Sequence, residues 1–275
     1  MARLIQSFRV KARGKDYLML NNTQIATEHY NKYNTSYMKT YGSVLQSYMT
    51  KNPKEMLAFM GAKMDFKKGD YVLDAGCGFG GPALYYSQSY DIKIKAINID
   101  ADQICIANQL KDNNNIKNID FLLHDFHELY SLSDKSAFDK IFFLESIGHC
   151  RNLHSVLKEC SKVLSPDGCI FIKTMFSKPS ITIEQPNAIK DVRKFYGYTI
   201  YNETDFKNIV RKSKFVITEI SEFPNMELNL NRVEFFEKLV KYDTPGDMVS
   251  NNCELGWKNF SMKYIILRRE SYGIS

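Results

Sequence analysis

The sequence of 275 residues predicts an α/β fold in which helices flank a parallel β-sheet. Short apolar runs typical of buried strands alternate with longer segments of helical periodicity, as in β-α-β units. A glycine-rich stretch directly follows the first apolar run, at the sheet edge where such folds bind ligands. Hydrophobic residues make up 44% of the chain and charged residues 25%, which excludes a disordered or collagen-like protein.

Residues 1–65 are predicted to form a helical extension that is rich in tyrosine. Tyr30, Tyr33, Tyr37, Tyr41 and Tyr48 lie three, four or seven positions apart, so they gather near one helical face. The first interpretation is an amphipathic helix packed on the main domain. The alternative is an aromatic lid over a pocket.

Residues 66–176 are predicted to form the core of the sheet. Strands are expected at residues 71–73, 92–99, 119–123, 138–144 and 169–174. The helices between them are expected to run through residues 85–89, 103–112 and 153–164. Residues 165–168, with the sequence Ser-Pro-Asp-Gly, predict a turn before the fifth strand.

Residues 177–212 break this alternation and are predicted to form a helical cap insertion. Residues 213–275 are expected to complete the sheet with strands at 215–223 and 264–269. No run approaches 18 uninterrupted apolar residues, so integral membrane association is not expected. The basic start of the chain lacks the apolar block of a secretory signal.

Cysteine usage and charge narrow the functional class. The six cysteines are scattered without a CxxC pair, which indicates reduced thiols, a cytoplasmic location and no zinc site. The net charge of +6 is modest, and the lysines form no basic block. Nucleic acid is therefore not an expected partner, whereas a small-molecule substrate is.

The strongest functional signal is the stretch VLDAGCGFGG at residues 72–81. Gly76, Gly78 and Gly80 form a GxGxG pattern after a strand, which lets the backbone turn tightly and a bulky ligand lie against it. A dinucleotide site is the rival interpretation. Asp74 argues against it, because a carboxylate there would repel a pyrophosphate and would suit a cationic or amine-bearing ligand.

This stretch resembles the first motif of class I S-adenosylmethionine-dependent methyltransferases, and the resemblance continues in order over residues 70–175. It implies a Rossmann-like, seven-stranded sheet that binds S-adenosyl-L-methionine. The cofactor-binding residues that it implies are Asp74, Gly76, Cys77, Gly78, Asn98, Ile99, Gln103, Asp125 and Phe126.

Asn98 departs from the family's pattern, and Asp125 has an alternative structural role. Asn98 stands where the family has an acid that binds the ribose, but an amide can still bond to hydroxyls, and Asp100 could share the role. Asp125 lies in the segment that resembles the adenine-binding one. The alternative for Asp125 is the N-cap of a helix.

Within the superfamily, the chain resembles sterol and prenyl diphosphate C-methyltransferases. The resemblance rests on Gly80-Gly81-Pro82-Ala83, on Asn98 and Gln103, and on Glu145 followed four residues later by His149. The last 100 residues show no convincing match. The resemblance therefore implies methylation of an alkene carbon but not a sterol substrate, and the expected substrate is an isoprenoid, a prenyl diphosphate first of all.

Glu145 and His149 are the predicted catalytic residues. Methylation of an alkene leaves a carbocation, which a carboxylate stabilises and from which it can remove a proton. His149 could orient Glu145 or relay the proton. The alternative for Glu145 is a salt bridge to a neighbouring lysine, and the alternative for His149 is a helix-start histidine without catalytic duty.

A prenyl diphosphate substrate would need a cationic cradle. The predicted substrate-binding residues are Tyr37, Lys39, Tyr41 and Arg193. Mg²⁺ could accompany such a substrate, bound mainly through the diphosphate oxygens, and no protein metal site is predicted.

Three other functions compete with this hypothesis. The first is N- or O-methylation of another small metabolite by the same fold. The second is a methyltransferase-like scaffold without catalysis. The third is RNA methylation, which the chain does not favour because it has no DPPY-like tetrapeptide after the fourth strand. Homo-oligomerisation is left open by the sequence.

Overall fold

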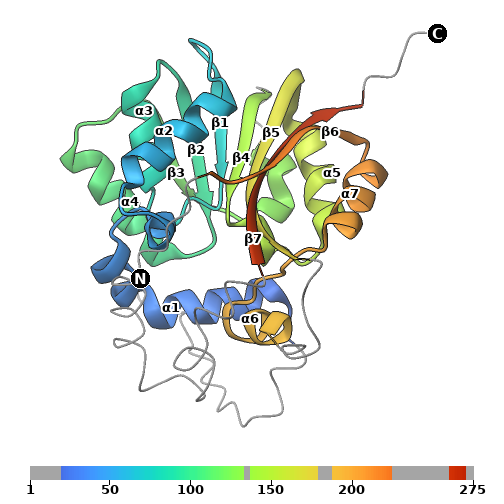
Figure 1. The fold of residues 1–275 in the computed structure, drawn as a ribbon. Coiled ribbons are helices and arrows are strands. Elements are labelled where there is room, and N and C mark those ends of the chain that lie inside the picture. Colours follow the sequence, from blue (N-terminus) through green and yellow to red (C-terminus); the bar gives the residue numbers. More distant parts are fainter. Residues whose placement is uncertain (1–19, 133–136, 179–187, 225–259, 271–275) are drawn as a thin grey trace.

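A computed structural model describes residues 20–132, 137–178, 188–224 and 260–270, which form a mixed seven-stranded sheet (Figure 1). The strand order is β3-β2-β1-β4-β5-β7-β6. The strands are β1 (Tyr71–Ala75), β2 (Lys93–Asn98), β3 (Ile119–Leu123), β4 (Phe138–Leu144), β5 (Leu164–Ser177), β6 (Phe215–Glu222) and β7 (Phe260–Arg269).

The sheet is not entirely parallel, which corrects the sequence prediction. Strands β1 to β5 pair in parallel, whereas β7 lies antiparallel between β5 and β6. The alternation of strands and helices along the chain predicts parallel pairing only where a helix connects two successive strands. The predicted turn at residues 165–168 falls within β5, where the pairing to β4 shifts register between Phe138 and Lys140.

Helices cover both faces of the sheet. Helices α2 (Pro53–Met64), α3 (Gly81–Ser89) and α4 (Ala101–Asn113) contribute to a core on one face, and α5 (Leu153–Val163) and α7 (Glu203–Lys212) to a core on the other. Because helices cover both faces and side chains alternate along a strand, the central strands are mostly apolar on both sides. Among the described residues, no helix is both long and apolar enough to cross a bilayer.

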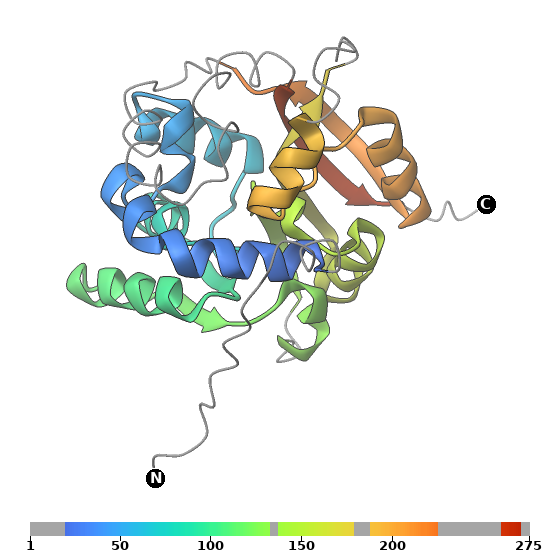
Figure 2. The ribbon, with the colours of Figure 1, turned by 90° about the horizontal axis from the view of Figure 1, so that it is seen from below.

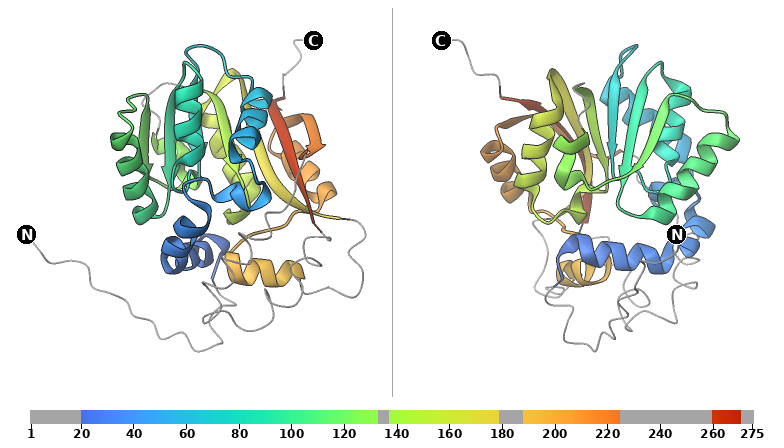
Figure 3. Two further views of the ribbon diagram at one scale, coloured as in Figure 1. Left: turned by 60° about the vertical axis from the view of Figure 1, so that its left-hand side comes forward. Right: turned by 180° about the vertical axis from the view of Figure 1, so that it is seen from behind.

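Two further helices lie across one end of the sheet. Helix α1 (Asn22–Tyr41) and helix α6 (Ala188–Tyr196) run beside each other below the strands (Figures 1, 2 and 3). Helix α1 begins at a capping box in which Asn21 and Gln24 satisfy each other's backbone N–H groups. These two helices close the edge of the sheet at which the parallel strands end.

The segment predicted as a cap divides into two parts. Helix α6 lies against α1, but α7 packs against α5 and β6 and belongs to the layers of the sheet. Phe206 and Val210, four positions apart on α7, are fully buried at 0% and 1% exposure. These two residues form an apolar stripe that packs against the core beside β6 and α5. Helix α7 therefore flanks the sheet and does not cap the ligand-binding edge.

Candidate functional site

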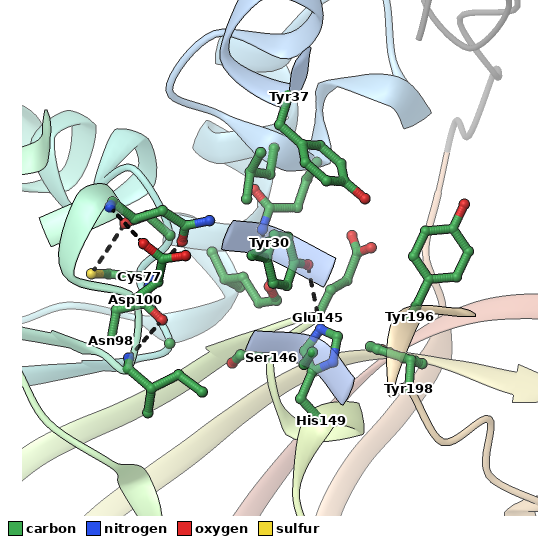
Figure 4. Close-up of a pocket in the computed structure, with 18 of the residues that line it drawn as sticks. Tyr30, Tyr37, Cys77, Asn98, Asp100, Glu145, Ser146, His149, Tyr196 and Tyr198 are labelled. Carbon is green, nitrogen blue, oxygen red and sulfur yellow. Dashed lines mark hydrogen bonds between the residues drawn. The ribbon is translucent and has the colours of Figure 1, made fainter. Parts of the chain in front are cut away.

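A cavity of about 280 Å³ lies between the ends of the strands and the helices α1 and α6 (Figure 4). Segments far apart in the sequence form its wall, including α1, the short helix η2 (Leu45–Met49) and the loops after β1, β2, β3 and β4. The predicted site residues that line it are Gly76, Cys77, Gly78, Asn98, Ile99, Gln103, Asp125, Phe126, Glu145, His149, Tyr37 and Tyr41.

The glycine loop forms one side of the cavity, where Gly76 and Gly78 present backbone without a side chain. Gly76 and Gly78 have φ angles of 97° and 56°, in the left-handed region that favours glycine. A Cβ atom at Gly76 would lie 2.3 Å from Cβ of Ser146, so no larger residue fits without a shift. The N–H groups of Gly76 and Cys77 both donate to the carbonyl of Ile97 at 2.9 Å. Burial raises the pKa of the Cys77 thiol well above its usual value, so the thiol stays neutral.

Asp74 does not line the cavity. Its side chain is 1% exposed, and its Oδ2 atom has no hydrogen-bond partner among the described residues. Burial raises the pKa of this carboxyl well above the usual range. Asp74 is therefore buried and lies outside the described lining of the cavity.

A polar network occupies the start of α4. Asn98 Nδ2 donates to Gln103 Oε1 at 2.5 Å, and Gln103 Nε2 donates to Asn34 Oδ1 at 2.7 Å. Asp100 caps α4 by accepting from the Gln103 N–H at 2.9 Å, and it also accepts from Asn34 Nδ2 at 2.8 Å. Helix α1 is thus tied through Asn34 to the residues predicted to bind a ribose.

Asp125 caps the turn that follows β3. Its Oδ1 atom accepts from the His127 N–H at 2.9 Å and from His127 Nδ1 at 2.5 Å, and Arg151 lies 3.3 Å from Oδ2. Burial raises the pKa of Asp125, but the hydrogen bonds from His127 and the charge of Arg151 outweigh it and lower that pKa overall. The capping alternative is present in the structure, while Asp125 and Phe126 still face the cavity.

Glu145 follows β4 and has a φ of 64°, an uncommon conformation for a residue other than glycine. Its N–H donates to the carbonyl of Lys173 at 2.8 Å. Its carboxylate is paired with the Lys173 ammonium through Oε1 and accepts a hydrogen bond from the Tyr48 hydroxyl through Oε2. The salt bridge expected as the alternative to catalysis is therefore present, yet the side chain still lines the cavity.

His149 reaches the same part of the cavity (Figure 4). Its Nδ1 atom is 3.1 Å from the carbonyl of Gly197, which can only accept, so Nδ1 carries the proton. Its Nε2 atom then accepts from the Tyr30 hydroxyl at 3.4 Å. Burial lowers the pKa of His149 to about 4, so the ring is neutral near pH 7.

Tyrosines form the side of the cavity opposite the glycine loop. Helix α1 contributes Tyr30, Tyr37 and Tyr41, and Tyr48, Tyr196 and Tyr198 complete the set. Burial raises the pKa of Tyr30, Tyr37, Tyr48 and Tyr198, so these hydroxyls remain protonated. In Figure 4 the rings of Tyr30, Tyr37, Tyr196 and Tyr198 surround Glu145 and His149.

Two predicted substrate ligands lie elsewhere. Lys39 borders a separate surface depression between α1 and α4. It lies two positions from both Tyr37 and Tyr41, so it occupies a different face of the helix from theirs. Arg193 is exposed, and its Nε donates to Asn22 Oδ1 at 3.0 Å. Neither residue is among the described residues that line the cavity, so a role for either in substrate binding stays a prediction.

The wall of the cavity is acidic and aromatic. Within the described part of the chain, it includes Asp100, Asp125 and Glu145 but no lysine or arginine. The described residues include no group of three His, Cys, Asp or Glu side chains that could hold a metal ion. The site as described suits a ligand that is cationic or becomes cationic.

Sequence reasoning missed two residues beside Glu145. Lys173 is the only charged residue in the apolar run CIFIKTMF, and such a lysine inside a buried strand must find a partner, so this signal was available. Gln46 lines the cavity and donates from Nε2 to the carbonyl of Leu144 at 2.9 Å. Nothing in its local sequence distinguishes Gln46 from an ordinary helix residue.

Known methyltransferases are similar to the part of the chain that forms the glycine side of the cavity. Residues 73–172, which contain the glycine loop and the network residues Asn98, Asp100 and Gln103, match the family described as Methyltransferase domain. Residues 73–172 are a class I methyltransferase domain. It is similar to the sterol 24-C-methyltransferase of Saccharomyces cerevisiae, with 32% identity over 111 residues, or 40% of this chain and 28% of that protein. It is also similar to a ubiquinone biosynthesis O-methyltransferase of Glaesserella parasuis, with 31% identity over 121 residues, or 43% of this chain and 51% of that protein. The chain thus spans about half, or less, of these curated relatives.

Solved structures extend the likeness beyond the methyltransferase domain. The [4+2]-cyclase SpnF has a TM-score of 0.74 with 16% identity, covering 90% of this chain and 96% of that one. The geranyl diphosphate C-methyltransferase of Streptomyces coelicolor has a TM-score of 0.63 with 15% identity, covering 79% and 80%. At these identities the likeness shows the fold alone, so function has to be argued from the site.

Proposed function

We propose that the protein transfers a methyl group from S-adenosyl-L-methionine to an alkene carbon of a small isoprenoid. The observation that carries the proposal is the position of Glu145, a carboxylate paired with Lys173 and facing a cavity walled by tyrosines. An anionic group in an aromatic cavity stabilises a cation that forms beside it. Alkene methylation is a reaction that forms one.

The residues on the glycine side fit the proposed cofactor. The loop at Gly76 and Gly78 offers a surface without side chains, and Asn98 and Gln103 offer amides that can bond to hydroxyls. Gln46 faces the cavity with a buried Oε1 atom that has no hydrogen-bond partner among the described residues. An unpartnered buried acceptor suits the ammonium of the cofactor's amino acid end.

The proposed chemistry assigns one task to each protein group. When bound, the cofactor supplies an electrophilic sulfonium methyl, which the alkene π pair takes to leave S-adenosylhomocysteine and a carbocation. Glu145 then accepts a proton from the carbon beside the cation, and the released C–H pair forms the new double bond. The faces of Tyr30, Tyr37 and Tyr198 are suited to stabilise the cation, each by about 0.5–2 kcal/mol.

The relatives support this choice in part and also name its rivals. The yeast relative is named as a C-methyltransferase and one structural neighbour as a geranyl diphosphate C-methyltransferase, whereas the Glaesserella relative is an O-methyltransferase. The second candidate is therefore N- or O-methylation of a small metabolite. The acidic and aromatic wall favours it for an amine substrate, which such a wall would also attract.

The head group of the substrate is the open part of the proposal. A diphosphate needs cations or Mg²⁺, and the described wall contains no lysine or arginine. The substrate panel must therefore include neutral isoprenoids beside prenyl diphosphates, and Mg²⁺ must be varied.

The test is a mass-spectrometric incubation of the protein with S-adenosylmethionine, with and without Mg²⁺. The panel contains prenyl diphosphates, prenyl alcohols, a sterol, amines and phenols. We expect a mass gain of one methylene unit on an isoprenoid, with the new carbon bound to carbon. A gain only on an amine or phenol would replace the proposal with the second candidate. Cofactor binding without any product would contradict both.

A further inference from the structure

Lys173 is a buried lysine on β5 whose ammonium faces the cavity residue Glu145. Its side chain is 0% exposed, and it pairs with Glu145 Oε1 across the β4–β5 pair. Around the ammonium lie Met49, with its Sδ atom at 3.4 Å, and the ring of Phe223, whose centroid is 5.1 Å away. These neighbours carry no charge, so Glu145 is the partner that compensates the buried ammonium.

We propose that Lys173 is a positioning residue that keeps the Glu145 carboxylate ionised and aimed into the cavity. This inference rests on the proposed function, in which Glu145 accepts a proton. One carboxylate oxygen is committed to Lys173 and the other to Tyr48, so the side chain is fixed in one orientation. A carboxylate among tyrosines without a counter-ion would be driven toward its neutral form, which cannot accept a proton.

The backbone of Glu145 supports a functional reason for this arrangement. A residue other than glycine at φ 64° is strained and persists only where its surroundings hold it. Two hydrogen bonds fix it there, from the Glu145 N–H to the Lys173 carbonyl at 2.8 Å and from Gln46 Nε2 to the Leu144 carbonyl at 2.9 Å. A pair that only joined β4 to β5 would not need this conformation, whereas a carboxylate turned toward a cavity does.

Other titratable groups also face Glu145, and each is neutral near pH 7. Burial raises the pKa of Tyr30, Tyr48 and Tyr198, and the charge of Glu145 raises each of them further. Burial lowers the pKa of His149 to about 4. Burial lowers the pKa of Lys173 below its usual value, although the charge of Glu145 and its hydrogen bond partly oppose this. Among the described groups that face Glu145, Lys173 is thus the one that can supply a full positive charge.

The decisive variant is Lys173→Met, which keeps the length of the side chain and removes the charge. Protein labelled with ¹³C-glutamate is titrated by NMR, and the Glu145 carboxyl signal is assigned by its absence in Glu145→Gln. In Lys173→Met we expect the midpoint of this signal to move to higher pH by roughly 1–3 units relative to wild type. Lys140→Met is the matched control, because Lys140 is also buried but lies near the start of β4, away from the cavity. It should leave the midpoint unchanged.

An unchanged midpoint in folded Lys173→Met would overturn the inference. If that variant does not fold, the ¹³Cε signal of Lys173 is followed in Glu145→Gln, where it should titrate at lower pH than in wild type. Equal titration there would overturn the inference as well.

Kinetics separate positioning from a merely structural role. Once a substrate is known, Lys173→Met should lower kcat with little change in KM and should move the acid limb of the pH profile to higher pH. If no substrate is methylated at all, the proposed function fails, while the NMR titration still decides whether Lys173 sets the charge of Glu145.

Discussion

The two sides of the cavity differ in how they are built. The glycine side, with Gly76, Gly78, Asn98 and Gln103, comes from consecutive strand-to-helix turns within one short stretch of chain. The tyrosine side joins α1, η2 and α6, which are distant in sequence, and Glu145 lies where the two sides meet. A local chain segment can be recognised by its motif, whereas a surface assembled from distant segments is defined only by folding.

The largest effect is expected from a substitution on the glycine side of the cavity. We expect Gly78→Arg to abolish binding of S-adenosylmethionine, with at least a hundredfold loss of affinity in calorimetry. A side chain there would begin 3.0 Å from Leu45 and would grow into the cavity from a backbone with φ 56°. Gly69→Arg is the matched control, because Gly69 also has a positive φ of 87° but has open space around it and lies at the other end of β1. Unchanged affinity in Gly78→Arg would move the cofactor out of this cavity.

This contrast explains how much the sequence could predict. The bounds of β3 and β4 match the expected ones, and the loop after β1 lines the cavity, because strand periodicity and glycine spacing are local properties. Asp74 resembles the family residue equally well, yet its side chain is buried and does not line the cavity, because a motif fixes the position of a residue and not the surroundings of its side chain.

The tyrosine side was only partly predictable for the same reason. The seven- and four-residue spacing of Tyr30, Tyr37 and Tyr41 indicates a shared face of α1 but not what that face covers. Lys39 and Arg193 were assigned by charge alone, and charge does not tell an exposed face from a cavity wall. Tyr198 and Gln46 carry no local signal, since only long-range packing brings them to the cavity.

The second prediction tests the junction of the two sides. Glu145→Gln should lower turnover by about a hundredfold or more and leave cofactor affinity unchanged, because general acid–base groups contribute on that order. Removing one partner of a buried ion pair can cost about 3–5 kcal/mol, so folding must be checked by circular dichroism. Glu128→Gln, at an exposed position after β3, should change neither quantity. Near-normal turnover in Glu145→Gln would reduce Glu145 to its structural salt bridge.

The third prediction concerns the buried histidines of the tyrosine side. Burial lowers the pKa of His149 to about 4 and that of His29 to about 3. Between pH 6.5 and these values the unfolded chain binds protons that the folded chain does not, so the free energy of unfolding falls as the pH falls. Each histidine should contribute a slope of up to about 1.4 kcal/mol per pH unit.

Urea unfolding between pH 7 and pH 4.5 measures this slope. His149→Gln should remove one histidine's share of this slope. A slope that is the same in wild type and His149→Gln would mean that His149 is not held neutral in the folded protein.

The smallest effect is expected from a substitution that lies outside both the glycine side and the tyrosine side of the cavity. Lys39→Met should change the free energy of unfolding by no more than about 0.5 kcal/mol, as is usual for an exposed position. It should also leave the KM of any anionic substrate within about twofold, because Lys39 faces the depression between α1 and α4 and not the cavity. A several-fold rise in KM for prenyl diphosphates alone, with no change for neutral isoprenoids, would show that a diphosphate reaches past the tyrosine side to this surface. The boundary drawn around the cavity would then be too narrow, and the acidic wall would hold only the part of the substrate that becomes cationic.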